Sequence, residues 1–426
     1  MPKIHWARCA ALFWGLVVFM PVGVNYLAFF ALLACMLAQG DWPERIQRLR
    51  GHRMWWPAVF FMAWTLLVLA VQPTYPETPS NLWHGLRIVA TLALALALKR
   101  DEAMWALRGF WIAAIVSLAI VGLHHLVGLP DWPLWANLLR MSGNKSISNA
   151  VLFSLVAASA LAVSLERGGW IRPACVALAV ALMAVVTWAL PSRTSLLIIL
   201  ITLAASFIHL WRSRKLQLAT ALMAAGLAAS VAAMNIPAVQ QRFAQGLGEI
   251  KQAQEGDVSP VSWGVRVNMY QHTAQMMLER PLLGWGVGSW NQQWKQRVPA
   301  QIADFNMPHN DFLWMGAQAG LPGALALLAL VLAGMQRGWS RTDLRGRLAF
   351  AASLTLLLAT SFNSAMRDAA IGLSVLWVVG LYLRMAEEQQ PAMNRIDSDP
   401  SPQPTRHPDA ADHQTSRHTG DHQQAA

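Results

Sequence analysis

A histidine, an asparagine and an aspartate stand together directly before a long apolar segment, in MPHNDFLWMGAQAGLPG (307–323). The unperturbed pKa of imidazole, about 6.5, lets His309 accept a proton at neutral pH, which few side chains can do. Asn310 and Asp311 suit a simpler role, because short polar side chains before a helix cap its first backbone N–H groups. His309 is therefore the candidate general base of the sequence, and a structural, hydrogen-bonded histidine is the alternative.

Arginine side chains form the second group of residues that could take part in chemistry, because a guanidinium binds phosphate or pyrophosphate through two parallel hydrogen bonds. Arg193, in ALPSRTSLLI, opens an apolar segment, where an unpaired cation is costly and a function is the default explanation. Snorkelling to lipid headgroups is the rival explanation. A helix predicted over 263–280 has one stripe by alternating spacings of four and three, which consists of Arg266, Tyr270, Thr273, Met277 and Arg280. Arg280 either binds an anion or faces water and lipid phosphates.

Further cations are predicted on the same, outer side of the membrane, namely Arg87, Arg140, Lys145 and Arg367. Together they predict an anion-binding cavity that opens to the outer leaflet. No run of carboxylates accompanies them, so we predict no metal site. Asp368 beside Arg367 is explained by a local salt bridge, or it orients a histidine or an arginine. A base with several arginines suits transfer of a group from a pyrophosphate donor to an alcohol.

Long apolar segments must position these residues. The chain has 426 residues, of which 55% are hydrophobic and 13% charged, and about 20 apolar residues span a membrane as one helix. We predict an all-α polytopic membrane protein with about 12 transmembrane helices; eleven is the alternative, since only 21–23 divides the first two spans. The predicted spans are 8–21, 23–39, 54–72, 83–99, 105–127, 146–165, 173–190, 193–211, 216–234, 312–335, 346–363 and 369–386.

The orientation follows from basic connections that alternate along the chain and should be cytoplasmic. They are 41–53, 99–102, 166–173, 211–215 and 336–347. Both termini are then cytoplasmic, and the formal charge of +11 reflects topology rather than nucleic-acid binding. The predicted parts are nine spans in 1–234, a long periplasmic loop with amphipathic helices in 235–311, three spans in 312–386 and a disordered cytoplasmic tail in 387–426. In the loop, the glycines of GWGVGSW (284–290) predict a tight turn.

Three motifs resemble a known family. They are PSRTSLL at the start of a span, an R-x-x-M-Y helix that leads to ERPLLGWGVG, and HNDFLWMGAQAGLPG at the end of the long loop. Over 190–325 the chain resembles the O-antigen ligase and polymerase superfamily of bacterial envelopes. In length, topology and loop position it is most similar to the lipopolysaccharide O-antigen ligases.

The resemblance implies a multi-pass protein of the bacterial inner membrane with a periplasmic active site. It implies a glycosyltransferase, without metal or other cofactor, that moves a glycan from undecaprenyl pyrophosphate to a sugar hydroxyl of lipid A-core among membrane lipids. Arg193 and Arg266 match the pyrophosphate-binding arginines, and His309 matches the essential histidine. Asp368 matches an acidic residue by position. The supporting candidates are Asn310, Arg367, Arg280, Arg140 and Arg87.

Two other functions remain open at this stage. An O-antigen polymerase or a protein O-oligosaccharyltransferase uses the same donor and differs in the acceptor. A transporter of a lipid-linked sugar is a more distant alternative. It needs polar residues that continue to the inner face, whereas the candidate cations and His309 are predicted on the outer side.

Overall fold

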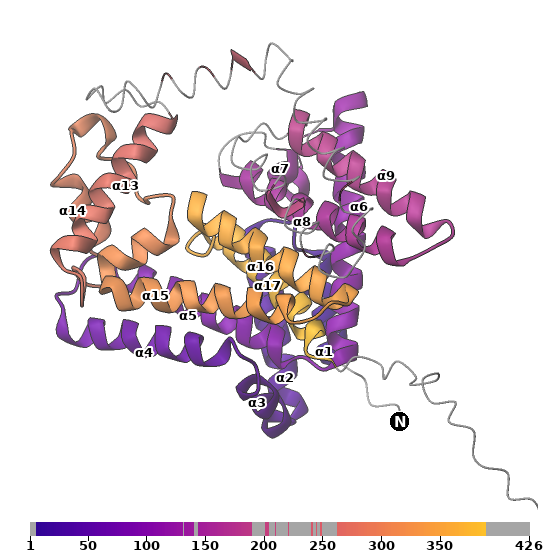
Figure 1. The fold of residues 1–426 in the computed structure, drawn as a ribbon, viewed down its shortest axis with the longest axis horizontal. Coiled ribbons are helices and arrows are strands. Elements are labelled where there is room, and N and C mark those ends of the chain that lie inside the picture. The colour runs from indigo at the N-terminus through magenta and orange to yellow at the C-terminus, as the bar shows by residue number, and fades with distance from the viewer. Residues whose placement is uncertain are drawn as a thin grey trace, which may run out of the picture. The chain divides into compact units, whose positions relative to one another are not determined.

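The computed structural model describes residues 6–130, 132–139, 144–189 and 262–388, with a few single positions between 201 and 248. Every regular element within these ranges is helical, and no strand occurs in them. The all-α fold is therefore confirmed for this part of the chain (Figure 1). Most of the predicted spans 193–211 and 216–234 lies outside the described residues, as does the predicted tail from residue 389 onward.

Each predicted span within the described ranges coincides with a helix. In chain order the helices are α1 (Trp6–Leu16), α2 (Val22–Gln39), α3 (Trp42–Arg50), α4 (Trp55–Val71), α5 (Thr78–Ala97), α6 (Arg100–Val127), α7 (Pro133–Leu139), α8 (Asn144–Glu166), α9 (Ile171–Ala184), the π-helix η1 (Val185–Ala189), α13 (Ser262–Glu279), α14 (Trp290–Lys295), the 3-10 helix η2 (Ala300–Ile302), α15 (Asp311–Trp339), α16 (Leu344–Phe362) and α17 (Ala369–Ala386). Sequence patterning therefore located the helices well, apart from the short ones between spans.

Five of the described helices are long and apolar enough to cross a membrane, namely Val22–Gln39, Arg100–Val127, Ile147–Glu166, Asp311–Trp339 and Ala369–Ala386. A sixth arises if α3 and α4, which are bent by 92° relative to each other, form one broken span. The first helix, α1, has 11 residues, about half of what a straight crossing needs. The described part thus has the character of a multi-pass membrane protein, and the total of twelve spans stays a prediction.

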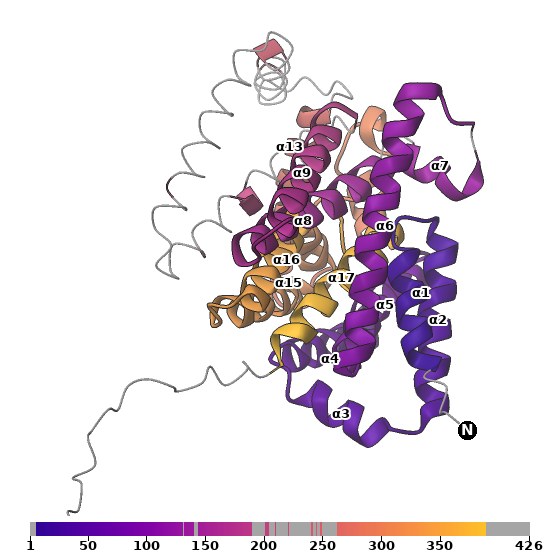
Figure 2. The same cartoon turned by 90° about the vertical axis from the view of Figure 1, so that its right-hand side faces the viewer.

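Small residues allow the helices to approach closely, as is usual in membrane bundles. A side chain at Gly15 of α1 would clash with the carbonyl oxygen of Ala106, and one at Gly109 of α6 would lie 2.6 Å from the carbonyl oxygen of Leu12. These two helices therefore run with their backbones in contact (Figure 2).

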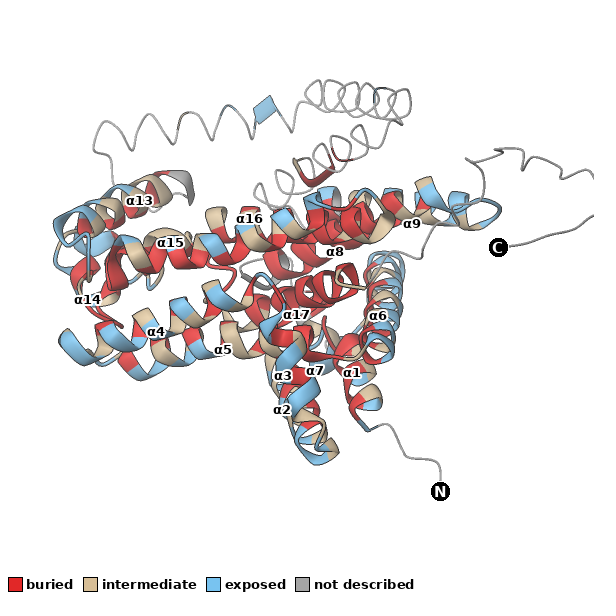
Figure 3. Cartoon of the chain, turned by 60° about the horizontal axis from the view of Figure 1, so that its bottom comes forward, coloured by how far each residue is buried: buried red, intermediate tan, exposed pale blue. Residues whose placement is uncertain are grey.

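Burial differs sharply among the apolar helices (Figure 3). In the apolar stretch of α17, 89% of the residues are buried, whereas in that of α6 28% of the residues are buried. The exposed face of α6 is itself apolar, as Leu126 and Val127 show at one end. We infer that α17 lies inside the bundle and that α6 presents a face to lipid.

The helix α15 carries the candidate site and packs against α16 and α4. It is kinked at Gly320, whose φ is 69°. A side chain at Gly320 would clash with the backbone of Leu282, and Leu321 N–H donates to the carbonyl of Pro281 at 2.7 Å. The kink therefore lets the segment after α13 lie directly against α15 and fixes its place.

The helix α13 confirms the helix predicted over 263–280. Its predicted stripe includes Thr273, which is fully buried, and Met277, which contacts Gly316 of α15. This stripe of α13 is thus covered by protein over part of its length. Arg280 follows the last residue of α13 and is exposed.

Candidate histidine and arginine site

The backbone of His309 is held in an unusual conformation at the entrance to α15. Its φ of 54° is the one positive value of a non-glycine residue in the described part of the chain. Such conformations cost free energy and are frequent at functional sites. The Tyr270 hydroxyl lies 3.0 Å from the His309 carbonyl oxygen and 3.3 Å from that of Ser361, so it bridges the two segments. Contacts from α13 and α16 therefore fix the His309 backbone.

The imidazole of His309 is fixed as well. Its Nδ1 lies 3.0 Å from Oδ1 of Asn363, the residue that ends α16. An amide oxygen only accepts hydrogen bonds, so Nδ1 carries the proton and donates it. Nε2 then keeps its lone pair, and no hydrogen bond to Nε2 comes from the described residues. This tautomer makes Nε2 the ring nitrogen that can accept a proton.

The surroundings of His309 favour the neutral imidazole. Burial lowers the pKa of His309 below its ordinary value of 6.5, the hydrogen bond to Asn363 raises it, and the positive charges of Arg266 and Arg367 lower it further. The net direction is downward. The lowered pKa favours the neutral imidazole, which is the form that can accept a proton.

The side chains of Asp311 and Arg87 hold the connection between α16 and α17 (363–368). The fully buried Asp311 accepts hydrogen bonds from the backbone N–H of Met366 at 2.7 Å and of Arg367 at 3.4 Å. Arg87 of α5 donates to the carbonyl oxygens of the same two residues, at 3.0 Å for Met366. The connection is thus held from both sides, which places Asn363 and Arg367 near His309.

The two residues at the start of α15 have different roles. Asn310 caps α15, since its Oδ1 accepts from Leu313 N–H at 3.0 Å, as the sequence predicted. Its Nδ2 also donates to the Ser361 carbonyl at 3.0 Å. Asp311, for which the sequence also suggested capping, reaches the α16–α17 connection instead, because that connection carries buried N–H groups that lack other acceptors.

Arg367 is a partly buried cation that forms no ion pair with another residue of the described ranges. Its guanidinium lies over the Trp314 ring at 5.7 Å, and within the described ranges it makes no hydrogen bond or ion pair. Asp368 does not form the predicted local salt bridge with it, because its carboxylate caps α17 through Ala370 and Ile371 N–H. Burial lowers the pKa of Arg367. A desolvated guanidinium of this kind is costly unless an anion binds it.

The other predicted cations differ in how close they lie to His309. Arg266 is near, because its charge acts on both His309 and Tyr270. Arg280 instead stacks on the Trp285 ring at 4.1 Å, and no described contact links it to His309. Arg193 and Arg140 lie outside the described residues.

The glycine-rich stretch 284–290 forms the predicted tight turn. Gly284, Gly286 and Gly288 all have positive φ. The turn is anchored on α15, since Trp285 N–H donates to the Ala317 carbonyl at 2.9 Å. A Cβ at Gly288 would lie 2.5 Å from the backbone nitrogen of Thr78 at the start of α5. Glycine is needed here for conformation and close approach.

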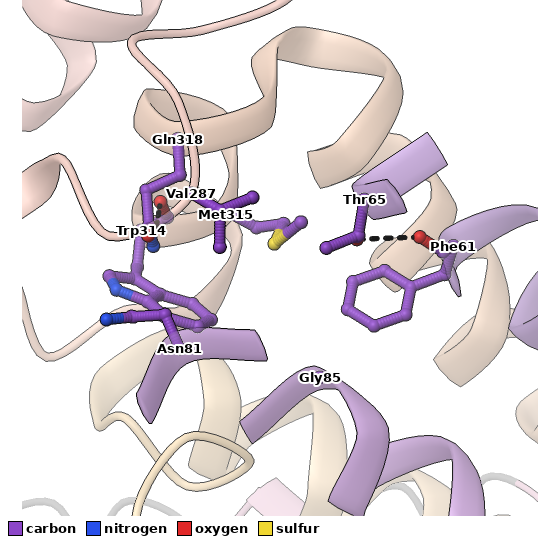
Figure 4. Close-up of a pocket in the computed structure, with 8 residues that line it drawn as sticks. All are labelled: Phe61, Thr65, Asn81, Gly85, Val287, Trp314, Met315 and Gln318. Carbon is purple, nitrogen blue, oxygen red and sulfur yellow. Dashed lines mark hydrogen bonds between the residues drawn. The ribbon is translucent and has the colours of Figure 1, made fainter. Parts of the chain in front are cut away.

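A small cavity lies below this turn, between α4, α5 and α15 (Figure 4). Phe61, Met315 and Trp314 line it together with a few polar side chains, such as Asn81 and Gln318. Its free space is about 10 Å³, which is room for about one water molecule. It is therefore too small for the anion-binding cavity that the sequence predicts.

Sequence reasoning missed Asn363 and the bridging role of Tyr270. Asn363 lies far from the loop motif, and its only signal was a polar residue at the end of an apolar helix. Tyr270 belonged to the predicted stripe of α13, but nothing in its spacing indicated a bond to His309. Both roles depend on contacts between segments that are distant in the sequence.

The fold and the site together define a multi-pass helical membrane protein with a histidine before α15, an arginine of α13 and an arginine before α17. Residues 152–328 match the family model described as O-antigen ligase. The resemblance to the O-antigen ligase and polymerase superfamily is thereby confirmed for this segment. The comparison with curated proteins found no match. The matched segment contains Arg266 and His309 and ends before Asn363 and Arg367.

Proposed function

We propose that this protein is a glycosyltransferase that joins an O-antigen glycan, carried on undecaprenyl pyrophosphate, to a sugar hydroxyl of lipid A-core. The family match supports O-antigen ligase or polymerase chemistry in general. The single observation that carries the assignment of the site is the setting of His309, whose Nδ1 lies 3.0 Å from Oδ1 of Asn363 and whose imidazole lies within the field of two arginines. The proposed site faces the periplasm of the bacterial inner membrane.

The proposed reaction follows from these groups. His309 Nε2 takes the proton of the acceptor hydroxyl while the acceptor oxygen bonds to the anomeric carbon of the donor sugar. The bond from that carbon to the pyrophosphate oxygen breaks, and undecaprenyl pyrophosphate leaves with the bonding electron pair. Arg266, Arg193 and Arg367 bind the leaving pyrophosphate, whose negative charge they stabilise as it develops. No metal ion or other cofactor takes part in this scheme.

The test is reconstitution of the purified protein in liposomes with undecaprenyl-pyrophosphate glycan, lipid A-core and EDTA. We expect a ladder of glycan-bearing lipid A-core that disappears in His309→Gln. A matched control is His272→Gln, a histidine of α13 whose ring packs beside Trp294 rather than in the site.

Three outcomes separate the candidate functions. Longer undecaprenyl-linked chains without transfer to lipid A-core would instead identify a polymerase, and transfer to an added acceptor peptide would identify an O-oligosaccharyltransferase. Movement of the donor across the membrane without any transfer would identify a transporter. Full activity of His309→Gln would refute the role of the site.

A further inference from the structure

We propose that Asn363 is a positioning residue that sets the tautomer and the orientation of His309, so that Nε2 faces the acceptor hydroxyl. This inference rests on the proposed function. It adds a residue from the α16–α17 connection, outside the segment matched by the family model.

The hydrogen bond itself supplies the first argument. Asn363 is 1% exposed, and its Oδ1 lies 3.0 Å from Nδ1 of His309. In neutral imidazole one ring nitrogen carries the proton and the other has the lone pair. An acceptor fixed at Nδ1 therefore keeps Nε2 free of a proton. Loss of this acceptor lets the ring rotate and take the other tautomer, which cannot accept a proton at Nε2.

The cost of burying Asn363 supplies the second argument. Its Nδ2 is buried and has no hydrogen-bond partner in the described part of the chain. A buried amide with unused donors lowers stability by about 1–3 kcal/mol. An apolar residue of similar size would avoid this cost. The amide is thus poorly explained by folding and well explained by its bond to His309.

The anchoring of Asn363 supplies the third argument. The connection that begins with this residue is held by Asp311 and Arg87 through backbone hydrogen bonds. His309 is held on its other side by Tyr270. Both partners of the Nδ1 bond therefore have fixed backbones, which is what a residue that orients a base requires.

The experiment compares Asn363→Asp, Asn363→Leu and the control Ser364→Ala in the reconstituted transfer assay. Ser364 follows in the same connection, is equally buried, and its Oγ has no described partner. The rate is measured from pH 5 to 9, together with the apparent melting temperature of each variant.

Asn363→Asp should keep transfer at alkaline pH, because a carboxylate can only accept and so preserves the Nδ1–H tautomer. Its negative charge should stabilise imidazolium against the charges of Arg266 and Arg367. The acid limb of the rate profile should then move upward by about one pH unit or more. Asn363→Leu should lose about 100-fold in rate with a nearly unchanged melting temperature, because removal of the unpartnered Nδ2 offsets the lost bond to Nδ1. Ser364→Ala should behave as the wild type.

The inference is overturned if Asn363→Leu transfers as fast as Ser364→Ala, or if the acid limb of Asn363→Asp does not move. It is equally overturned if Asn363→Asp is inactive at every pH, because the opposite tautomer is then the active one. His309→Gln separates the two claims. If His309→Gln is inactive while Asn363→Leu is active, only the positioning role of Asn363 fails. If His309→Gln is active, the proposed function of the site fails.

Discussion

Replacement of Asp311 by alanine should release the α16–α17 connection. It should thereby disturb the site although His309, Asn363 and Arg367 keep their side chains. The carboxylate accepts a 2.7 Å hydrogen bond from Met366 N–H and a longer one from Arg367 N–H, and both Asp311 and Met366 are fully buried. A hydrogen bond contributes about 0.5–1.5 kcal/mol net, and each unsatisfied buried N–H costs about 1–3 kcal/mol. We therefore expect a loss of about 3 kcal/mol. That corresponds to about a 100-fold change in the equilibrium between the α16–α17 connection bound to α15 and the connection detached from it.

Hydrogen exchange of the peptide that covers 363–368 measures this release directly. Asp311→Ala should exchange faster there, melt at a lower temperature and transfer glycan more slowly, because Asn363 is no longer fixed. Asp311→Asn keeps one acceptor oxygen and should lie between Asp311→Ala and the wild type. The matched control is Asp304→Ala, since Asp304 is exposed on the same segment.

The reasoning is refuted if Asp311→Ala shows the same exchange in 363–368 as Asp304→Ala. Unchanged exchange would mean that Arg87 and packing alone hold the connection. Faster exchange together with an unchanged transfer rate would instead show that the position of the connection does not matter for the reaction.

Three further predictions concern other parts of the site. His309→Gln should lower the transfer rate by about 10²- to 10⁴-fold and leave the melting temperature nearly unchanged; a rate within a factor of two of the wild type would contradict a proton-transfer role. Arg266→Gln removes a positive charge that lowers the pKa of His309, so that pKa should rise and the acid limb should move to higher pH, whereas Arg266→Lys should leave the limb in place. Gly288→Ala brings a Cβ to 2.5 Å from Thr78 N at a φ of 89°, so the melting temperature should fall by several degrees; a stable variant would show that the turn can move away from α5.

The positions of the helices were predictable because apolar length and local polarity decide them. The boundaries of α15 and α17 lie within a few residues of the predicted spans 312–335 and 369–386. Helix α13 was likewise predicted almost to the residue. The kink at Gly320 was not predicted, because it depends on the backbone of Leu282 lying against α15.

The site was predictable only in its residue types. A histidine before α15 and arginines near it followed from sequence, and the cap by Asn310 followed from its position. The interpretation of Arg367 and Asp368 as a local salt bridge was wrong, since the choice between pairing and capping depends on the geometry of the start of α17. Asn363 was missed because its partner lies 54 positions away in the sequence. Contacts between the ends of helices are set by packing, which local patterns do not encode.

The most direct test of the central claim is the dependence of the transfer rate on pH under single-turnover conditions, with the wild-type protein and saturating donor and acceptor. If His309 takes the acceptor proton, the rate should be constant near neutral pH and fall in an acid limb whose midpoint lies below pH 6.5, because burial and two arginines lower its pKa. A midpoint clearly above pH 7, or an acid limb that persists unchanged in His309→Gln at a similar rate, would contradict the account.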